Sequence, residues 1–181
     1  MEEVRRTFSE TIAHYRELRE LCYEETNQEF ASLGVRASAI TPRDVADGDE
    51  WSRQWTGEKV PIWTWAAMYR DYRRGPNIKG FDLAIRSAGQ LRALCIGTPS
   101  KRRLILKLHA LDRAPRDNPL AGHIFRIVLF AASTYGLLLG SEELWLMDPQ
   151  TENVARYYAR FGFTPHRSRT GVLTHMSQKL R

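Results

Sequence analysis

Three consecutive segments decide the fold: RLILKLHAL at residues 103–111, AGHIFRIVLFAASTYGLLL at 121–139 and ELWLM at 143–147. The first alternates apolar and polar residues, which is typical of a half-buried strand, and the third is a short apolar run suited to a second strand. The middle segment is apolar on most sides and ends at Gly140, which is typical of a buried helix. A strand, a helix and a strand in succession form a right-handed crossover, so we expect the two strands to lie parallel in one sheet.

The segments on either side of this crossover predict more of the sheet. Residues 81–86 and 91–97 alternate around the turn at 88–90, which is typical of an antiparallel hairpin. Residues 151–161 have the pattern of a helix, and residues 171–176 have that of an antiparallel edge strand. The sequence therefore predicts an α/β fold with a mixed sheet flanked by helices.

The N-terminal part has the pattern of helices and irregular segments, not of strands. Apolar residues at intervals of three and four predict a helix over 4–33, which Gly34 ends. Residues 35–60 are polar and contain proline and glycine, so we expect irregular structure with a short helix near 44–55. A further helix is predicted over 66–74, before Gly75-Pro76.

Composition favours one globular domain. The chain has 181 residues, of which 43% are hydrophobic and 27% charged, so it can bury a full core. Cys22 and Cys95 lack metal-ligand spacing, and we expect both to be reduced and buried in a cytoplasmic protein. No secretory signal is visible at residues 1–6. The apolar segment 121–139 carries His123 and Arg126, so a buried helix is expected there and not a membrane span.

The net charge is +6 and the sequence pI is about 9.6. The basic residues are scattered along the chain and form no single run, so nucleic acid is not expected as a partner. An anionic cofactor explains a basic protein better.

The loop Asn118–His123 suggests where such a cofactor would bind. It leads from the first strand of the crossover into the helix, whose first turn has unpaired backbone N–H groups and a partial positive charge. Gly122 lets an anion approach the backbone closely. These features predict a phosphate site, although a proline and a glycine also mark ordinary helix starts.

The segment after the second strand carries a resemblance to a known family. Within residues 151–163, a predicted short helix contains Tyr158 near its end. Three residues follow Tyr158, and then Gly162-Phe163. This pattern, together with the order of strand, loop, helix and strand, resembles the GNAT N-acetyltransferases over about residues 81–178. The resemblance implies a mixed sheet in which a parallel pair of strands splays apart, with the pantetheine arm of acetyl-CoA in the gap. We take residues 1–181 as a single domain, with a helical, aromatic-rich acceptor side at 1–76 and an acyl-CoA-binding core at 81–178.

The resemblance also implies roles for individual residues. Tyr158 would protonate the departing thiolate, and Asn153 would contact the cofactor. Backbone groups of Leu108, Ala110 and Leu111 in the first strand would bind the pantetheine amides. The loop would hold the pyrophosphate through Leu120, Ala121, Gly122 and His123.

Two positions depart from the family pattern. The loop of the family reads Gln or Arg, two residues, Gly, one residue, Gly or Ala. Here Arg116 and Gly122 remain, but Leu120 is taken to stand at the first glycine. Thr151 occupies the position of a cofactor-contacting Asn, and Asn153 comes two residues later.

An acceptor amine must lose a proton to react, so a base is needed. Asp112 at the end of the first strand and His109 within it are the candidates, since carboxylates and imidazoles can accept that proton. Each also has a plain structural explanation, as a turn aspartate and as a strand histidine. His123 and His175 are weaker candidates.

The N-terminal part is rich in aromatic residues: Trp51, Trp55, Trp63, Trp65, Tyr69 and Tyr72. We expect them mainly to pack a core, and an aromatic wall for the acceptor is the alternative. Acidic residues nearby could attract a cationic acceptor or lie in a solvated loop: Asp44, Asp47, Asp49, Glu50 and Glu58.

The sequence thus predicts an acetyl-CoA-dependent N-acetyltransferase that transfers the acetyl group by direct attack, with no metal and no covalent intermediate. No Ser/His/Asp arrangement and no metal-ligand spacing favours another mechanism. The acceptor is an amine on a small molecule or a protein, no membrane partner is expected, and a homodimer stays open. A catalytically inactive GNAT-like binding module is the alternative, and a nucleic-acid-associated protein is a third hypothesis supported only by charge.

Overall fold

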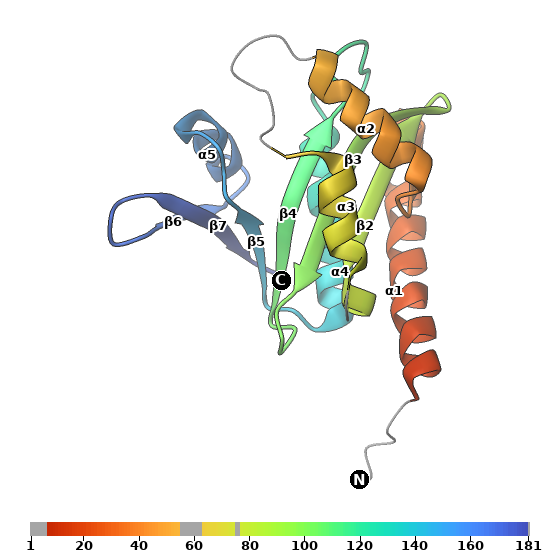
Figure 1. Ribbon diagram of the computed structural model, residues 1–181, viewed down its shortest axis with the longest axis horizontal. Coiled ribbons are helices and arrows are strands. Elements are labelled where there is room, and N and C mark those ends of the chain that lie inside the picture. Colours follow the sequence, from red (N-terminus) through yellow and green to blue (C-terminus); the bar gives the residue numbers. More distant parts are fainter. Residues whose placement is uncertain (1–6, 55–62, 75–76, 181) are drawn as a thin grey trace.

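The computed structural model describes residues 7–54, 63–74 and 77–180. The chain forms a seven-stranded sheet in the order β1-β2-β3-β4-β5-β7-β6 (Figure 1). The strands are β1 Val35–Ser38, β2 Phe81–Ser87, β3 Gln90–Pro99, β4 Ile105–Arg113, β5 Glu143–Met147, β6 Thr164–Arg167 and β7 Leu173–Lys179. The pair β4–β5 is parallel and the other neighbouring pairs are antiparallel, so the predicted mixed sheet and its crossover are confirmed.

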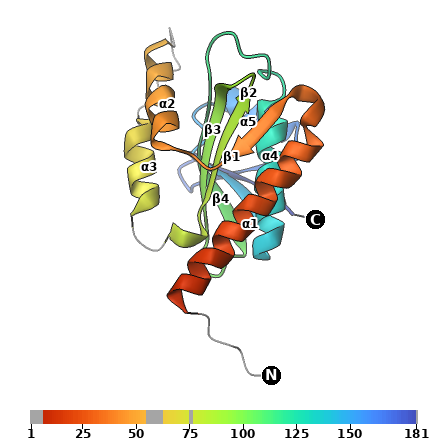
Figure 2. The same cartoon turned by 90° about the vertical axis from the view of Figure 1, so that its right-hand side faces the viewer.

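Helices cover both faces of the sheet (Figure 2). α1 and α4 lie against one face, and α2 and α3 lie against the other. The helices are α1 Phe8–Glu29, α2 Pro42–Gln54, α3 Trp65–Arg73, α4 Ile124–Leu139 and α5 Glu152–Ala159, with 3₁₀ turns η1 Ala31–Leu33 and η2 Asn77–Lys79.

Each face of the sheet has its own hydrophobic core. The core on the side of α1 and α4 contains Leu106 and Leu108 of β4. The core on the side of α2 and α3 contains Ala110 of the same strand, with Trp65 of α3. Residues two apart normally share a face of a strand, so the switch between Leu108 and Ala110 marks an irregularity in β4.

Two N-terminal predictions were wrong. Residues 35–38 were expected to be irregular, but they form β1 and pair with β2 in antiparallel register from Val35↔Ser87 to Ser38↔Ala84. Four residues are too few for a convincing alternation, and the packing of Val35 and Ala37 into the core decides this strand. The first helix ends at Glu29 and not at residue 33, because a 3₁₀ turn and the left-handed Gly34 follow it.

A buried polar network ties α1 and α3 to β2. Asp82 accepts hydrogen bonds from the Tyr72 hydroxyl at 3.1 Å and from the Ile40 backbone N–H at 2.7 Å. The Tyr23 hydroxyl donates to the Asp82 carbonyl at 2.7 Å, and the Arg19 guanidinium lies 3.8 Å from its carboxylate. The partners of Asp82 come from α1, from α3 and from the segment between β1 and α2, so this network fixes the N-terminal helices on the sheet.

Both cysteines are buried and have free thiols, as predicted. Within the described ranges, no helix is both long enough and apolar enough to cross a membrane. This finding agrees with the expectation that residues 121–139 form a buried helix, of which Ile124–Leu139 is the helical part.

Candidate functional site

The two parallel strands separate partway along their length. β4 and β5 are paired from Ile105↔Glu143 to Leu108↔Leu146. From His109 to Asp112, β4 has no strand partner on this side among the residues that the structure describes. The gap that opens here lies beside α5, between β4 and β5 (Figure 1).

A β-bulge in β4 accompanies the separation. On the β3 side, Ile96 pairs with Ala110 and Gly97 pairs with Leu108, so His109 is an extra residue with no counterpart. A bulge bends the strand that carries it, which turns β4 away from β5 at this point. Gly97 is needed opposite the bulge, because a Cβ there would lie 2.8 Å from the Lys107 carbonyl oxygen and from a Leu108 methyl group.

The loop after β4 is held by its own side chains. Asn118 donates from Nδ2 to the Arg92 carbonyl at 3.0 Å and accepts from the Leu120 N–H through Oδ1 at 3.0 Å. The Ala121 N–H donates to the Asn118 carbonyl at 3.0 Å, and the His123 N–H to the Leu120 carbonyl at 2.8 Å. Three of the four predicted pyrophosphate-binding residues therefore already use their backbone N–H groups within the loop.

The remaining N–H groups at this helix start are free. Gly122, Phe125 and Arg126 donate no backbone hydrogen bond within the described part of the chain, since the first bonds of α4 come from Ile124 and Ile127. A Cβ placed on Gly122 would meet nothing within 4 Å, so the space beside Gly122 is open. This arrangement suits an anion, and it adds Phe125 and Arg126 to a prediction that had named Gly122 alone among them.

The spacing of the family pattern can also be counted along the loop from Arg116. Counted from Arg116, the pattern assigns its first glycine to Pro119 and its second small residue to Ala121. Leu120 is therefore the residue between them, and its side chain is buried in the core next to α4. This count puts Pro119, which has no N–H to donate, at the first glycine in place of Leu120, and the correspondence of either residue to the family pattern stays a prediction.

Tyr158 lies on α5 against the start of α4. Its ring centroid is 4.6 Å from that of Phe125, one of the residues with a free N–H. Its hydroxyl has no hydrogen-bond partner among the described residues, and burial, with smaller contributions from Cys95 and Tyr157, raises the pKa of Tyr158 to about 12. The hydroxyl is therefore protonated at neutral pH and can donate.

Thr151 and Asn153 explain the second departure from the family pattern. The Thr151 hydroxyl accepts from the Val154 N–H at 3.2 Å, so Thr151 is the N-cap of α5. Asn153 is exposed, and its side-chain oxygen accepts a hydrogen bond from Arg156. These bonds use the Thr151 hydroxyl and the Asn153 side-chain oxygen as acceptors, and contact of Asn153 with a cofactor stays a prediction.

The two candidate bases differ in their surroundings. His109 is exposed, and its Nε2 lies 2.7 Å from the Thr98 hydroxyl. Partial burial of the ring, then the charge of Lys107, lower the pKa of His109, so the imidazole is neutral near pH 7. Burial raises the pKa of Asp112, whose carboxylate accepts from the Arg113 N–H at 2.8 Å and from the Trp65 indole at 3.5 Å.

His123 and His175, the two weaker candidates for the base, lie away from β4. His123 is the N-cap residue of α4 and makes no side-chain capping bond. His175 stacks on Trp145 at 3.9 Å between ring centroids and on His166 at 4.5 Å, in a row across β5, β7 and β6. Neither lies on β4.

The aromatic residues of the N-terminal part mostly form core. Trp51, Trp65 and Tyr72 are buried in the core on the side of α2 and α3, with Trp63 and Tyr69 partly buried against it. Trp55 lies outside the described residues. The expectation of a packed cluster is therefore confirmed for these five residues.

The acidic residues nearby are largely used in structure. Asp44 is buried and ion-paired with Arg86, and Asp49 accepts from the Trp65 N–H at the start of α3. Glu50 pairs with Arg53 at the surface, and Asp47 is exposed, while Glu58 lies outside the described residues.

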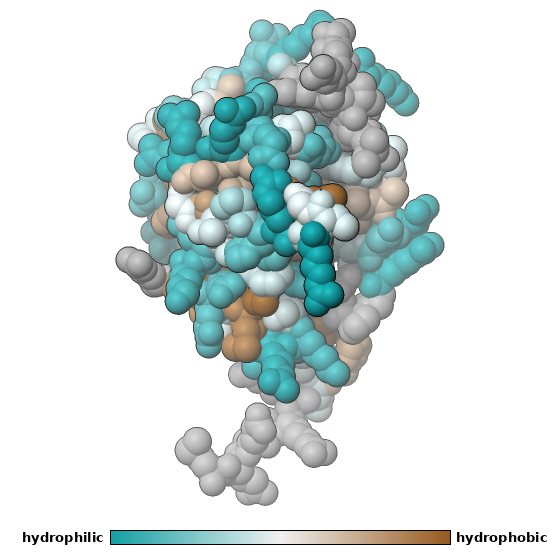
Figure 3. Space-filling model, turned by 90° about the vertical axis from the view of Figure 1, so that its left-hand side faces the viewer, coloured by the Kyte–Doolittle hydropathy of each residue, from teal (hydrophilic) through white to brown (hydrophobic). Residues whose placement is uncertain are grey.

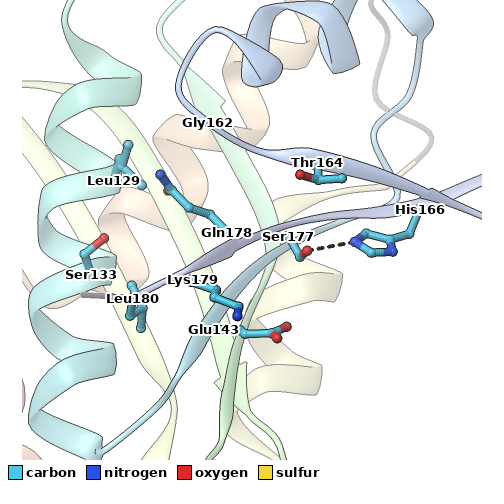
Figure 4. A pocket seen from close by; sticks show the side chains of 10 residues that line it. All are labelled: Leu129, Ser133, Glu143, Gly162, Thr164, His166, Ser177, Gln178, Lys179 and Leu180. Carbon is cyan, nitrogen blue, oxygen red and sulfur yellow. Dashed lines mark hydrogen bonds between the residues drawn. The ribbon is translucent and has the colours of Figure 1, made fainter.

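A cavity of about 820 Å³ lies away from the gap (Figure 4). It is bounded by Leu129 and Ser133 of α4 and by Gln178 and Leu180 at the end of the chain, and the gap residues of β4 do not line it. The side of the molecule toward α5 and the β6–β7 hairpin is mostly hydrophilic (Figure 3), in keeping with the full exposure of β6. We therefore base the functional argument on the gap and not on this cavity.

Comparison with known proteins identifies the fold. No protein-family model matches the sequence, and no curated protein matches it. Among solved structures, Ard1 from Thermoplasma volcanium superimposes with a TM-score of 0.62 at 13% identity, covering 82% of this chain and 99% of that one. The putative acetyltransferase yncA from Salmonella typhimurium, with its cofactor acetyl-CoA, gives 0.58 at 12% identity, covering 82% and 95%. An aminoglycoside 6'-N-acetyltransferase complexed with coenzyme A gives 0.57 at 13% identity, covering 80% and 97%.

The chain has the GNAT fold. The match extends over about four-fifths of the chain, more than the residues 81–178 to which the sequence resemblance extends. Identities of this size show the fold alone.

Proposed function

We propose that this protein is an acetyl-CoA-dependent N-acetyltransferase in which an amine acceptor attacks the acetyl group directly. The observation that carries the proposal is the meeting of three features at Phe125. Its free N–H belongs to the helix start, its ring packs on Tyr158 of α5, and α5 lies beside the gap between β4 and β5. The backbone that would bind the phosphates is thereby packed against the residue that we propose as the proton donor.

The cofactor would be held at two points. Gly122, Phe125 and Arg126 would bind the pyrophosphate through their backbone N–H groups. Ala110 and Leu111, on the unpartnered edge of β4, would bind the pantetheine amides as a neighbouring strand does. Leu108 is still paired with β5 and marks the closed end of the gap.

When bound, acetyl-CoA supplies an acetyl thioester, whose carbonyl carbon the amine attacks as the carbon–sulfur bond breaks and the thiolate leaves. Tyr158 donates its hydroxyl proton toward the sulfur, because its raised pKa keeps that proton in place and no described residue competes for it. The ammonium proton of the attacking amine would pass to a base on β4, and return of a proton from that base to Tyr158 would restore both groups.

We propose His109 as that base, ahead of Asp112. If the phosphates bound at the loop after β4, the pantetheine arm would extend along the unpartnered edge of β4, on which His109 lies closer to the closed end of the gap than Asp112 does. A neutral imidazole accepts a proton at pH 7. Asp112 lies nearer the phosphate end, and it already accepts two hydrogen bonds.

Thermal unfolding with acetyl-CoA tests the proposal. A ligand at 100 times its Kd stabilises the folded state by about 2.7 kcal/mol, which for a domain of this size raises Tm by roughly 5–10 °C. ATP, which has the phosphates without the pantetheine arm, is the control and should give a smaller shift. No shift at millimolar acetyl-CoA would overturn the enzyme and leave the alternative, a GNAT-like binding module.

A further inference from the structure

Arg92 on β3 is a buried cation without a counter-ion. Its exposed fraction is 7%, and its Nε is the one buried side-chain polar atom without a hydrogen-bond partner in the described ranges. No ion pair to Arg92 is found among the same residues. An unpaired buried charge is costly, so its retention calls for a compensating anion.

The backbone places Arg92 under the phosphate loop. Arg86 pairs with Leu91 and Ile85 with Ala93, so Arg92 is the extra residue of a second β-bulge, in β3. Arg92 also stands one residue beyond the last β3–β4 pair, Ala93↔Arg113. The loop that leaves β4 therefore starts directly beside it.

Arg92 holds both ends of this loop. Its carbonyl oxygen accepts from the Ala114 N–H at 2.9 Å and from the Asn118 side chain at 3.0 Å. Its Nη1 donates to the Asp117 carbonyl at 2.7 Å. Asp117 has a φ of 46°, a left-handed conformation that is unfavourable for a non-glycine residue, and the bond from Arg92 helps to keep it there.

The loop in turn leads to the free N–H groups. Asn118, fixed by Arg92, accepts from the Leu120 N–H, and the buried Leu120 side chain anchors the chain just before Gly122. A change at Arg92 is thus transmitted through Asn118 to the place where an anion would bind, without Arg92 touching that anion.

We infer that Arg92 is a positioning residue for the phosphates of an acyl-CoA. The guanidinium sets the shape of the loop, and its unpaired positive charge is compensated when a phosphate group binds at Gly122. This inference rests on the proposed function, since it needs acyl-CoA as the ligand. It assigns a role to a residue of β3 that the resemblance to the GNAT pattern leaves without one.

Calorimetric titration of the full chain with CoA tests the inference. Arg92→Met removes the charge and all five donors at similar length, and Arg92→Lys keeps the charge. We expect Arg92→Met to weaken CoA binding by about tenfold and to flatten its dependence on salt, with a smaller loss for Arg92→Lys. Arg102→Met, at an exposed position in the β3–β4 turn, is the control for net charge and should bind CoA like the parent.

A second ligand separates positioning from folding. Pantetheine lacks the phosphates, so its affinity should be equal in the parent and in Arg92→Met, and the Tm of the unliganded variants should stay near that of the parent. Parent-like binding of CoA by Arg92→Met overturns the inference alone. If Arg92→Met and Arg92→Lys both lose pantetheine affinity, CoA affinity and Tm to the same extent, Arg92 is a structural residue. That result also overturns the inference. If the parent itself does not bind CoA, the proposed function fails, and this inference fails with it.

Discussion

The network around Asp82 and the loop before α4 differ in how their polar groups are satisfied. Around Asp82, a carboxylate, two tyrosine hydroxyls and a guanidinium are joined by hydrogen bonds or ion pairs within the chain. At the loop and the gap, backbone N–H groups, the Tyr158 hydroxyl and the Arg92 Nε have no partner among the described residues. Both regions belong to the same sheet.

This difference separates residues that hold the fold from residues that we propose to meet a ligand. Buried polar groups are nearly always satisfied in folded proteins, because each unsatisfied group costs free energy, and the Arg92 Nε is the buried side-chain exception among the described residues. Gly122 and Arg126 are exposed, so a ligand could reach their N–H groups. The following experiments ask whether loss of stability and loss of binding divide between the two regions in this way.

The largest effect is expected at Asp82. Asp82→Ala leaves Arg19 without its carboxylate and removes the acceptor of Tyr72, so we expect a loss of about 3–5 kcal/mol in the free energy of unfolding. Urea denaturation measures it. Asp71→Ala, which removes an exposed carboxylate from pairs with Arg70 and Arg74, should change stability little. If Asp82→Ala leaves the free energy of unfolding unchanged, the proposed difference between the two regions is wrong.

At Gly122 the effect should fall on binding. Gly122→Asp puts a negative charge where the pyrophosphate would approach, so we expect CoA affinity to fall by about a hundredfold or more. The unliganded protein should unfold near the parental Tm, since a Cβ there meets nothing within 4 Å. Gly122→Ala adds the Cβ without the charge and should bind better than Gly122→Asp. Equal losses of affinity and Tm would assign Gly122 to packing.

The pH profile distinguishes the two candidate bases. The pKa of His109 is lowered from its usual value near 6.5, so His109 is protonated only below that pH, and the transfer rate should fall as the pH drops through the lowered pKa. His109→Gln should reduce the rate at pH 7 by about a hundredfold and abolish this acid limb. If the limb persists in His109→Gln and disappears in Asp112→Asn, Asp112 is the base.

The same lowered pKa of His109 also predicts how the free energy of unfolding depends on pH. The direction is opposite to that for a histidine in a salt bridge, whose pKa is raised on folding. Because the folded state lowers the pKa of His109, protons bind the unfolded chain more readily. The contribution of His109 to stability is therefore present above pH 6.5 and is lost as the pH falls through the folded-state pKa.

The smallest effect is expected at Tyr158. Tyr158→Phe removes a hydroxyl that has no hydrogen-bond partner among the described residues, so stability should change little. If the hydroxyl protonates the thiolate, kcat should fall by about tenfold with little change in KM for acetyl-CoA, because CoA thiolate is itself a fair leaving group. Tyr157→Phe, on a neighbouring residue with 39% exposure, is the matched control. Parental turnover by both variants would make Tyr158 a core residue.

The crossover of β4, α4 and β5 was predictable from the sequence because its signals are local. Apolar periodicity at 103–111 and 121–139 and the glycine that ends α4 are properties of neighbouring residues. The same reasoning gave β5 its observed bounds, Glu143–Met147. It also located Tyr158 and Gly122, whose roles remain predictions.

The tertiary structure decided the rest, because those features depend on contacts between distant segments. β1 exists through its pairing with β2 and its packing under α1, and the bulge at His109 depends on the close approach of Gly97 and Leu108 across two strands. Which loop N–H groups remain free follows from the bonds that Asn118 makes, and no local pattern in the sequence encodes them. Arg92 has the pattern of an ordinary strand residue, and only its burial under the loop makes it a cation without a counter-ion among the described residues. Local propensity therefore determined the order of the elements, whereas packing and hydrogen bonds between distant segments decided which groups of the candidate site stay open.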